Sequence, residues 1–214
     1  MCGRYFIDEE TVKKAEELVK MIDISLAGKR EIYPSSQAPV ILRYGQEMAG
    51  ELCSWGFDRF DGKGLIINAR AETVLEKRMF KKYAQGSRCV IPAAGFYEWS
   101  RDKVKHAFYQ RQQPDMYMAG ILRESKKGQQ FVILTTEANE SVKEIHSRMP
   151  LVLKKDQVEQ WVLSDDAVEF LLHQRPGQLE QRRARSGKLR IRAKFQDMIG
   201  GVSYENNLYL SYNR

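Results

Sequence analysis

Residues 88–135 read RCVIPAAGFYEWSRDKVKHAFYQRQQPDMYMAGILRESKKGQQFVILT, and this stretch decides the fold. It holds short runs that are mostly rich in β-branched or aromatic residues, separated by Gly, Pro or charged turns. The runs are Arg88–Pro92, Gly95–Trp99, His106–Arg111, Met116–Arg123 and Phe131–Thr135. Because no helical pattern lies between them, they predict an antiparallel, barrel-like sheet rather than parallel strands joined by helices.

Helical patterns surround this strand-rich stretch. An amphipathic helix is predicted from about Glu9 to Met21, with Asp8 placed to cap it. Further strands are predicted at Ala38–Tyr44 and Met48–Trp55, and further helices at Thr73–Ala84, Ser141–His146, Asp156–Leu163 and Asp165–Gln174. The predicted fold class is therefore α+β, with an antiparallel barrel-like β-sheet core and peripheral helices.

Length and composition suit a single domain over residues 1–214. The chain has 214 residues, 43% of them apolar, and no stretch resembles a flexible linker or a low-complexity tract. Acidic residues stand at positions 8–10, where a signal peptide would need an apolar run. The longest apolar stretch, Met116–Leu122, is far too short to span a bilayer. We expect a cytoplasmic protein without a membrane partner, and we take it to be a monomer.

The cysteines and histidines are few and far apart. The chain has three of each and no Cys-x-x-Cys spacing, so the sequence predicts neither a disulfide framework nor a zinc site. We expect no metal and no cofactor. Cys53 and Cys89 lie in apolar runs and are predicted to be small buried side chains. His106 and His173 lie in no motif. With Cys53 and Cys89 expected in the core, Cys2 is the cysteine with distinctive chemistry.

Cys2 follows the initiator methionine, so removal of Met1 would leave a thiol and a free α-amine on one residue. The pKa of an α-amine is about 7.7–8.0 and that of a free thiol about 8.5, so both groups are partly nucleophilic near neutral pH. Such an aminothiol condenses with an aldehyde through its amine and then closes through its sulfur to a five-membered thiazolidine. Cys2 alone, at a chain end, would not establish this chemistry.

Three further segments accompany Met1–Arg4 (MCGR). They are Ile67–Glu72 (INARAE), Ala94–Trp99 (AGFYEW) and Ile145–Leu151 (IHSRMPL). Taken in this order, the four motifs resemble the signature of the SOS-response-associated peptidase family, and the resemblance runs from residue 1 to about residue 163. It implies a protein that binds single-stranded DNA and joins its N-terminal cysteine covalently to the aldehyde of an abasic site.

The residues around Asn68 and Glu98 carry their own signals. Asn68 and Arg70 follow an apolar run, so strand alternation places them on one side, where both can reach one ligand. Glu98 is the single acid among three aromatic residues, an environment that raises the pKa of a carboxyl and suits a general acid or base. The plain alternatives are a turn at Asn68 followed by a surface Arg70, and a Glu98 that faces solvent.

His146 stands shortly before Pro150, which would end any helix there. A histidine at a helix end is ordinarily stabilised by the helix dipole alone. The resemblance implies instead a proton-transfer role, and it implies a catalytic set of Cys2, Asn68, Glu98 and His146.

The reaction that this set implies begins with opening of the abasic sugar ring, for which Glu98 and His146 are the acid and base pair. The amine of Cys2 then attacks the aldehyde, water leaves to form a Schiff base, and the thiol closes the thiazolidine. If the sulfur is slow, elimination at the 3′ phosphate from the same imine would cleave the strand. Crosslinking and lyase activity therefore share one intermediate.

DNA contacts are implied at cationic positions in or near the motifs, together with one hydroxyl. They are Arg4, Arg70, Arg78, Thr135 and Arg148. Phe57 and Phe60 offer a stacking surface for bases, whereas Trp55 is expected in the core. The loop from Phe57 to Phe60 is short and lacks the paired tryptophans common in the family.

Two alternative functions remain open. The first is a true cysteine peptidase, in which Cys2 would need only its thiol and would tolerate an extended N-terminus. The second is a non-enzymatic reader of DNA structure or modified bases, in which Cys2 would be dispensable.

The net charge of +7 is concentrated in one place. Residues 174–194 contain eight basic side chains and a single acid, Glu180, a surplus equal to that of the whole chain. Such a cluster attracts phosphate, although runs of charge are commonly just solvated surface.

If this basic segment contacts phosphates, replacing Arg182, Arg183 and Arg185 with Gln should weaken binding to any single strand. The log-log salt dependence of binding should flatten by roughly 0.7 per lost contact, while chemistry at saturating DNA is retained. Titrations at several salt concentrations measure the slope. An unchanged slope and affinity would show the segment to be an ordinary solvated surface.

Overall fold

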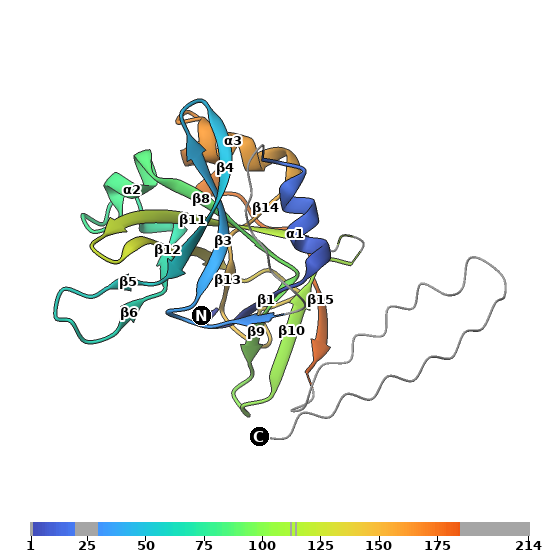
Figure 1. Cartoon of the computed structure of the whole chain (residues 1–214). Coiled ribbons are helices and arrows are strands. Elements are labelled where there is room, and N and C mark those ends of the chain that lie inside the picture. Colours follow the sequence, from blue (N-terminus) through green and yellow to red (C-terminus); the bar gives the residue numbers. More distant parts are fainter. Residues whose placement is uncertain (1, 20–29, 112, 114, 185–214) are drawn as a thin grey trace, which may run out of the picture. The chain divides into compact units, whose positions relative to one another are not determined.

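A closed ring of five strands forms the centre of the computed structural model, which describes residues 2–19, 30–111, 113 and 115–184 (Figure 1). The ring consists of β3 (Gln37–Tyr44), β4 (Glu47–Trp55), β8 (Arg88–Ala93), β11 (Met116–Ser125) and β12 (Gly128–Glu137). They pair in the order β4-β3-β8-β11-β12, and β12 closes the ring against β4. The predicted α+β class with a barrel-like sheet is confirmed.

Shorter strands extend the barrel sheet and build a second one. β7 (Asn68–Arg70), β13 (Arg148–Pro150) and β14 (Val152–Leu153) join the barrel strands β12 and β11. The second sheet is antiparallel, in the order β15 (Glu180–Arg183), β10 (Lys105–Tyr109), β9 (Gly95–Trp99), β1 (Tyr5–Ile7) and β2 (Arg30–Ile32). Strands β5 (Phe57–Asp58) and β6 (Leu65–Ile66) form a separate hairpin.

Two pairings depart from the expected antiparallel pattern. Strand β12 runs parallel to both β4 and β7. These partners are far from β12 in sequence, and alternation of apolar residues carries no information about which distant strand will be a neighbour. The charged strand β15 was also not foreseen, because Glu-Gln-Arg-Arg has no apolar alternation. Its place at the edge of the sheet leaves Arg182 and Arg183 exposed.

The first helix, α1 (Glu9–Glu16), begins where the sequence predicts. The carboxylate of Asp8 accepts a hydrogen bond from the Thr11 amide at 2.9 Å, which confirms Asp8 as the cap. The helix ends at Glu16, before the predicted end at Met21, and residues 20–29 lie outside the described part of the chain.

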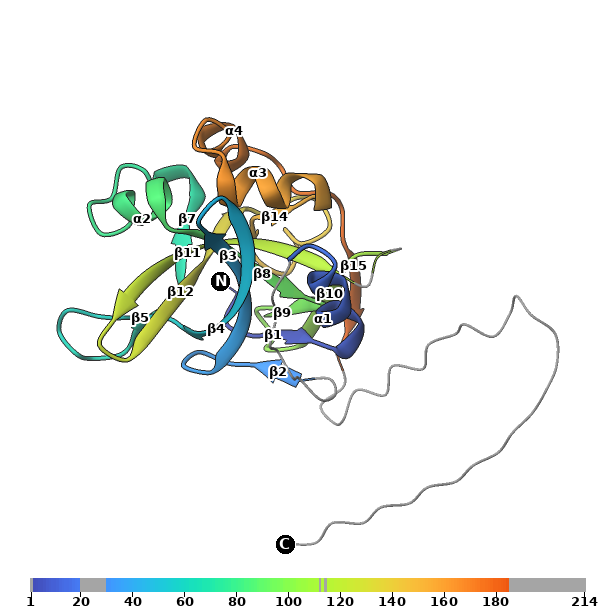
Figure 2. The same ribbon diagram turned by 45° about the horizontal axis from the view of Figure 1, so that its top comes forward.

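The C-terminal helices lie close to their predicted positions. The 3-10 turn η2 (Lys155–Gln157) leads into α3 (Val158–Leu163), which packs against β3, β4 and β8. Helix α4 (Val168–Leu172) follows and lies beside α3 (Figure 2), but it is shorter than the predicted Asp165–Gln174.

The predicted helix at Thr73–Ala84 is wrong. The segment instead forms the 3-10 turn η1 (Ala71–Thr73), further turns and the short helix α2 (Lys81–Gly86). Val74 is fully buried, while Phe80 and Tyr83 pack their rings against Phe57. In one continuous helix Val74 would point away from Phe80 and Tyr83, so the chain breaks to bury Val74 and to pack both rings against Phe57.

The predicted helix at Ser141–His146 is also absent. The amides of Val142 and Lys143 donate to the Asn139 carbonyl, and that of His146 to the Val142 carbonyl. These bonds close single turns only. The Asn139 side chain accepts from the Ser141 amide and donates to the carbonyls of Pro176 and Gly177, which anchors the turn without a helix.

The buried apolar residues form two clusters. One contains Cys2, Tyr5, Trp55 and Phe131, and the other contains Trp161 of α3. Both belong to one compact unit that ends at Ala184. Residues 185–214, including five of the eight basic side chains in residues 174–194, lie outside the described residues, so the single domain over 1–214 stays a prediction.

Gly95 begins β9 at a point where the backbone of β10 and the ring of Phe6 approach closely. A Cβ atom at this position would lie 2.3 Å from the Phe108 carbonyl oxygen and 2.6 Å from Cζ of Phe6. Any side chain would therefore push β9 away from its neighbours. Because Glu98 is on β9, this glycine also fixes the position of that carboxyl group.

Gly95→Ala should therefore destabilise the protein by about 1–3 kcal/mol through overpacking. Gly86→Ala is the control, because a Cβ atom there meets nothing within 4 Å. Urea denaturation of both variants measures the free energy of unfolding. Equal stability of the two variants would show that the strands can shift to admit a methyl group.

Candidate active site

Pairing between β1 and β9 brings the amino-terminal residues beside Glu98. Tyr5 lies opposite Phe96, and the Tyr97 amide donates to the Arg4 carbonyl at 2.9 Å. In an antiparallel pair, the residues before Tyr5 run alongside those after Phe96. Cys2 is fully buried there, and the negative charge of Glu98 contributes to raising the pKa of its thiol.

Asn68 contacts Cys2 directly. It begins β7, which pairs with β12 in the register Asn68 opposite Ile133. Its side-chain Nδ2 donates to the Cys2 carbonyl at 2.9 Å. The other amide atom, Oδ1, is buried and accepts no hydrogen bond from the described residues. Asn68 therefore holds the backbone of Cys2 while keeping an acceptor for a ligand hydroxyl or amine.

His146 is held by the backbone of Arg148. The ring nitrogen Nδ1 lies 3.0 Å from the Arg148 amide and 3.1 Å from its carbonyl oxygen. The amide donates to Nδ1 when this nitrogen carries no proton, and the carbonyl accepts from it when it does. Nδ1 thus has a backbone partner in either tautomer.

Burial dominates the electrostatics of the two other groups. It raises the pKa of the Cys2 thiol well above its ordinary value, and the Glu98 charge adds to this shift, so the thiol is protonated at neutral pH. Glu98 is only 3% exposed, and burial likewise raises the pKa of its carboxyl. The charge of His146 opposes that rise.

Arg148 joins the second motif to the fourth. Its guanidinium donates to both carboxylate oxygens of Glu72 at 2.8 Å, and the Thr135 carbonyl accepts from the same group. Thr135 itself is fully buried, and its hydroxyl donates to the Ala69 carbonyl at 3.4 Å. Arg148 and Thr135 therefore hold β7, β12 and β13 together.

The remaining arginines differ in exposure. Arg4 pairs with Glu31 at 3.4 Å and lies over the rings of Tyr33 and Trp99, at 4.4 Å and 5.1 Å from their centroids. Arg70 is exposed and makes no ion pair with any residue that the structure describes.

Arg78 is exposed as well, and it lines a groove of about 540 Å³ with Phe60 and Lys82. Of the two phenylalanines expected to stack on bases, Phe60 is 92% exposed and Phe57 is fully buried. The expectation is therefore wrong for Phe57.

Sequence reasoning missed the carboxylates that organise these cations. Glu31 accepts hydrogen bonds from Lys105 at 2.8 Å and from the Tyr33 hydroxyl at 2.9 Å, in addition to its contact with Arg4. Glu72 stands inside the second motif, and its place there was the one available signal. For Glu31 no local pattern gave a signal. Cys53, Cys89 and Trp55 are buried, as the sequence predicts.

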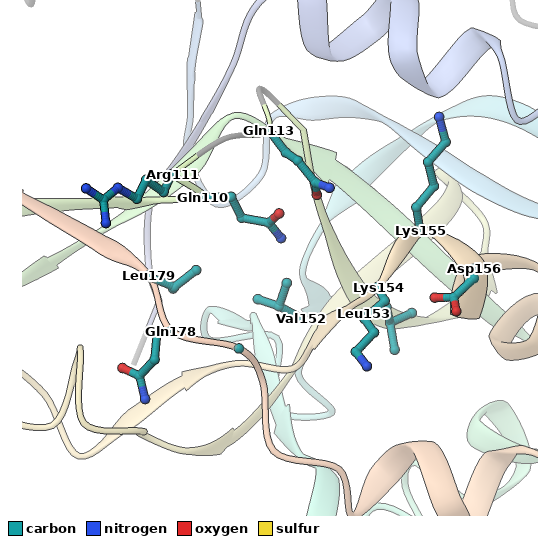
Figure 3. Close-up of a pocket in the computed structure, with 11 residues that line it drawn as sticks. Gln110, Arg111, Gln113, Val152, Leu153, Lys154, Lys155, Asp156, Gln178 and Leu179 are labelled. Carbon is teal, nitrogen blue, oxygen red and sulfur yellow. The ribbon is translucent and has the colours of Figure 1, made fainter.

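A separate cavity of about 670 Å³ contains none of the predicted site residues. Figure 3 shows its lining, which includes Gln110 and Arg111 after β10, Val152 of β14 and Leu179. Within residues 2–184, apart from the omitted positions, no group of three potential ligands could hold a metal ion. No helix in that part of the chain is long and apolar enough to cross a membrane.

Comparison with known proteins places these residues in context. The family model described as SOS response associated peptidase (SRAP) matches residues 1–186. The chain is 30% identical over 198 residues to "Abasic site processing protein YoaM" of Bacillus subtilis, covering 80% of this chain and 85% of that protein. It is 28% identical over 177 residues to "Abasic site processing protein YedK" of Escherichia coli, covering 76% and 79%.

A solved structure from Bacteroides thetaiotaomicron, described only as a protein, has a similar fold. The TM-score is 0.74 at 23% identity, and the alignment covers 86% of this chain and 93% of that one. This likeness supports the fold.

The raised pKa of Glu98 predicts a pH-dependent stability. Below its ordinary value of 4.5 the carboxyl is neutral in both the folded and the unfolded chain, and above it ionisation costs more in the fold. Glu98→Gln should therefore melt at a higher temperature than wild type, by a margin that grows as pH rises above 4.5 and levels off above the folded-state pKa. Thermal melts across this range test the sign.

Glu72→Gln should show the opposite trend. Burial acts to raise the pKa of Glu72, but it is outweighed by the hydrogen bonds from Arg148, from the Glu72 backbone and from Thr136 together with the Arg148 charge, which lower the pKa. Ionised Glu72 stabilises the folded protein above the unfolded-state pKa, and this stabilisation is lost as pH falls through the folded-state value. Glu72→Gln should therefore be less stable than wild type at neutral pH and equally stable in acid. Parallel curves for the two variants would contradict this assignment of charge.

Proposed function

Because the chain belongs to the SOS response associated peptidase family, we propose that it processes abasic sites in single-stranded DNA by a covalent crosslink through Cys2. The observation that carries this proposal is the hydrogen bond from Asn68 to the Cys2 carbonyl, in a buried setting with Glu98 alongside. Relatives named abasic site processing proteins support the choice of substrate.

The first step is opening of the abasic sugar ring. One group must protonate the ring oxygen while another removes the proton from the anomeric hydroxyl. The raised pKa of Glu98 keeps a carboxylic acid available closer to neutral pH. His146, with backbone partners at Nδ1 for either protonation state, is suited to accept and return a proton. The product is a free aldehyde.

The second step joins protein and DNA. Once Met1 has been removed, the α-amine of Cys2 adds to the aldehyde carbon, and one water leaves to give an imine. The S–H group then adds across the C=N bond, so that sulfur binds carbon and the proton goes to nitrogen. No oxidant or reductant is needed. Because burial keeps the thiol protonated, the amine is the first nucleophile.

Strand cleavage is a branch of the same route. The imine acidifies the neighbouring C–H, and loss of that proton expels the 3′ phosphate as a leaving group. Addition of the Cys2 thiol to the imine carbon competes with this elimination. The balance between crosslink and lyase products is therefore set by how well Cys2 is positioned.

Single-stranded DNA would be held by the exposed cations. Arg70 and Arg78 are accessible and suited to phosphate contacts, whereas Arg4 and Arg148 already pair with Glu31 and Glu72. We assign the latter two a shared role, in which they position the site and present a remaining N–H to a phosphate. The buried Thr135 would act through β12 rather than by direct contact.

A thiol peptidase is less well supported. A papain-like mechanism requires a thiolate, and burial together with the Glu98 charge raises the pKa of the Cys2 thiol instead of lowering it. The aminothiol route uses the thiol only after the amine has reacted.

Blocking the α-amine separates the two mechanisms. A Gly-Ser extension before Cys2 should abolish the denaturant-resistant adduct with an abasic oligonucleotide, although the thiol is retained. Cys2→Ala should lose the thiazolidine and keep some imine and lyase product. Cys53→Ala is the cysteine control and should react like wild type. Gel electrophoresis under denaturing conditions measures each product. An adduct formed by the extended protein would contradict the aminothiol mechanism.

Kinetics distinguish chemistry from binding. Glu98→Gln and His146→Ala should each slow the reaction at saturating DNA by roughly 10²–10⁴-fold. The DNA concentration that gives half of the maximal rate should change little. Arg70→Ala should do the reverse and raise the half-saturating concentration alone. Single-turnover rates over a range of DNA concentrations give both quantities. Equal losses of rate and affinity in the Glu98 or His146 variant would indicate a structural role.

A further inference from the structure

Trp55 is a buried indole that donates to the backbone next to Asn68. It ends β4 and is fully buried, and its Nε1 donates to the Ile67 carbonyl at 3.0 Å. The amide of Ile133 donates to the same carbonyl at 3.1 Å. Two donors thus fix the orientation of one peptide group, and the nitrogen of that group belongs to Asn68.

Ile67 is the point at which the chain changes partners. The residue before it, Ile66, pairs with Phe57 in the β5–β6 hairpin, and the residue after it, Asn68, pairs with Ile133 of β12. A peptide group at such a corner lacks the regular strand hydrogen bonds on both sides that would orient it. The indole N–H supplies one of the two hydrogen bonds that orient this peptide group.

The indole ring also packs against Phe131 of β12 and against the segment that carries Cys2. It stacks on Phe131 with a centroid distance of 6.3 Å and an interplanar angle of 5°. The ring of Tyr5, three residues after Cys2, meets it edge-on at 5.2 Å. One side chain therefore packs against β1 and bonds to the corner before Asn68. These are the two segments that the hydrogen bond from Asn68 to Cys2 joins.

We propose that Trp55 is a positioning residue for the crosslinking reaction, which sets Asn68 against Cys2 through the Ile67 carbonyl. This inference rests on the proposed function for its kinetic consequences. Its structural content is the dependence of the Asn68 to Cys2 hydrogen bond on the indole N–H. Trp55 need not touch the DNA at all.

Trp161 offers a matched control. It is also fully buried, and its Nε1 donates to the Cys89 carbonyl at 2.9 Å. It lies in the other buried cluster, on α3, and none of the four predicted catalytic residues belongs to that cluster. Trp55→Phe and Trp161→Phe therefore remove the same ring area and the same kind of hydrogen bond from two cores.

Single-turnover crosslinking to an abasic oligonucleotide tests the proposal. Trp55→Phe should lower the crosslinking rate at saturating DNA by about 10- to 100-fold. The DNA concentration that gives half of the maximal rate should change by less than about twofold. Trp161→Phe should leave both nearly unchanged despite a similar fall in melting temperature. In the Asn68→Ala background, Trp55→Phe should cause no further slowing, because its effect passes through Asn68.

Benzothienylalanine, in which sulfur replaces the indole N–H, serves if Trp55→Phe folds poorly. At position 55 it should reproduce the loss of rate, and at position 161 it should not. Equal slowing at the two positions, or additive slowing with Asn68→Ala, would overturn the proposal.

Nitrogen-15 NMR supplies a readout that needs no reaction. The chemical shift of the Asn68 side-chain amide should move toward the value of a solvent-exposed amide in Trp55→Phe and stay unchanged in Trp161→Phe. An unmoved signal in Trp55→Phe would overturn the inference. Absence of any adduct with the wild-type protein, together with the expected shift, would instead count against the proposed function alone.

Discussion

Strand β1 is paired on both sides, and this constraint pins the amino-terminal residues inside the protein. The first residues of a chain are ordinarily poorly ordered unless a strand ties them down. Here β9 and β2 flank β1, and the Tyr97 amide extends the pairing to Arg4. Cys2 is consequently buried, although it is the second residue of the chain. Every other feature of the site is arranged around that fixed point.

Burial of the site sets the order of steps in the proposed reaction. It raises the pKa of both the Cys2 thiol and the Glu98 carboxyl. The carboxyl, which is anionic in neutral water, is thereby biased toward its neutral form, and the thiol, which in water is partly ionised, is held protonated. A neutral thiol is a poor first nucleophile, and a neutral carboxyl is an available acid. The same desolvation that weakens a peptidase mechanism therefore favours an amine that attacks first and a sulfur that follows.

The sequence predicted the barrel strands better than the contacts that support them, and the membership of the active site stays a prediction. Short aromatic and β-branched runs predicted strands β8 to β12, because alternation is a local property. The predicted helix at Thr73–Ala84 is wrong, because burying Val74 while packing Phe80 and Tyr83 against Phe57 requires a break in the helix. Contacts such as that of Glu72 with Arg148, or of Trp55 with Ile67, join residues distant in sequence, and no local pattern announces them.

We propose that Cys2 reacts through both its amine and its sulfur, and the intact mass of the adduct can show this. We expect one species whose mass equals that of the chain without Met1 plus the abasic oligonucleotide, minus one water. Borohydride should leave this mass unchanged, because a closed thiazolidine has no C=N bond to reduce. A mass that retains Met1, or a gain of two hydrogens on reduction in every adduct, would rule out reaction through both groups.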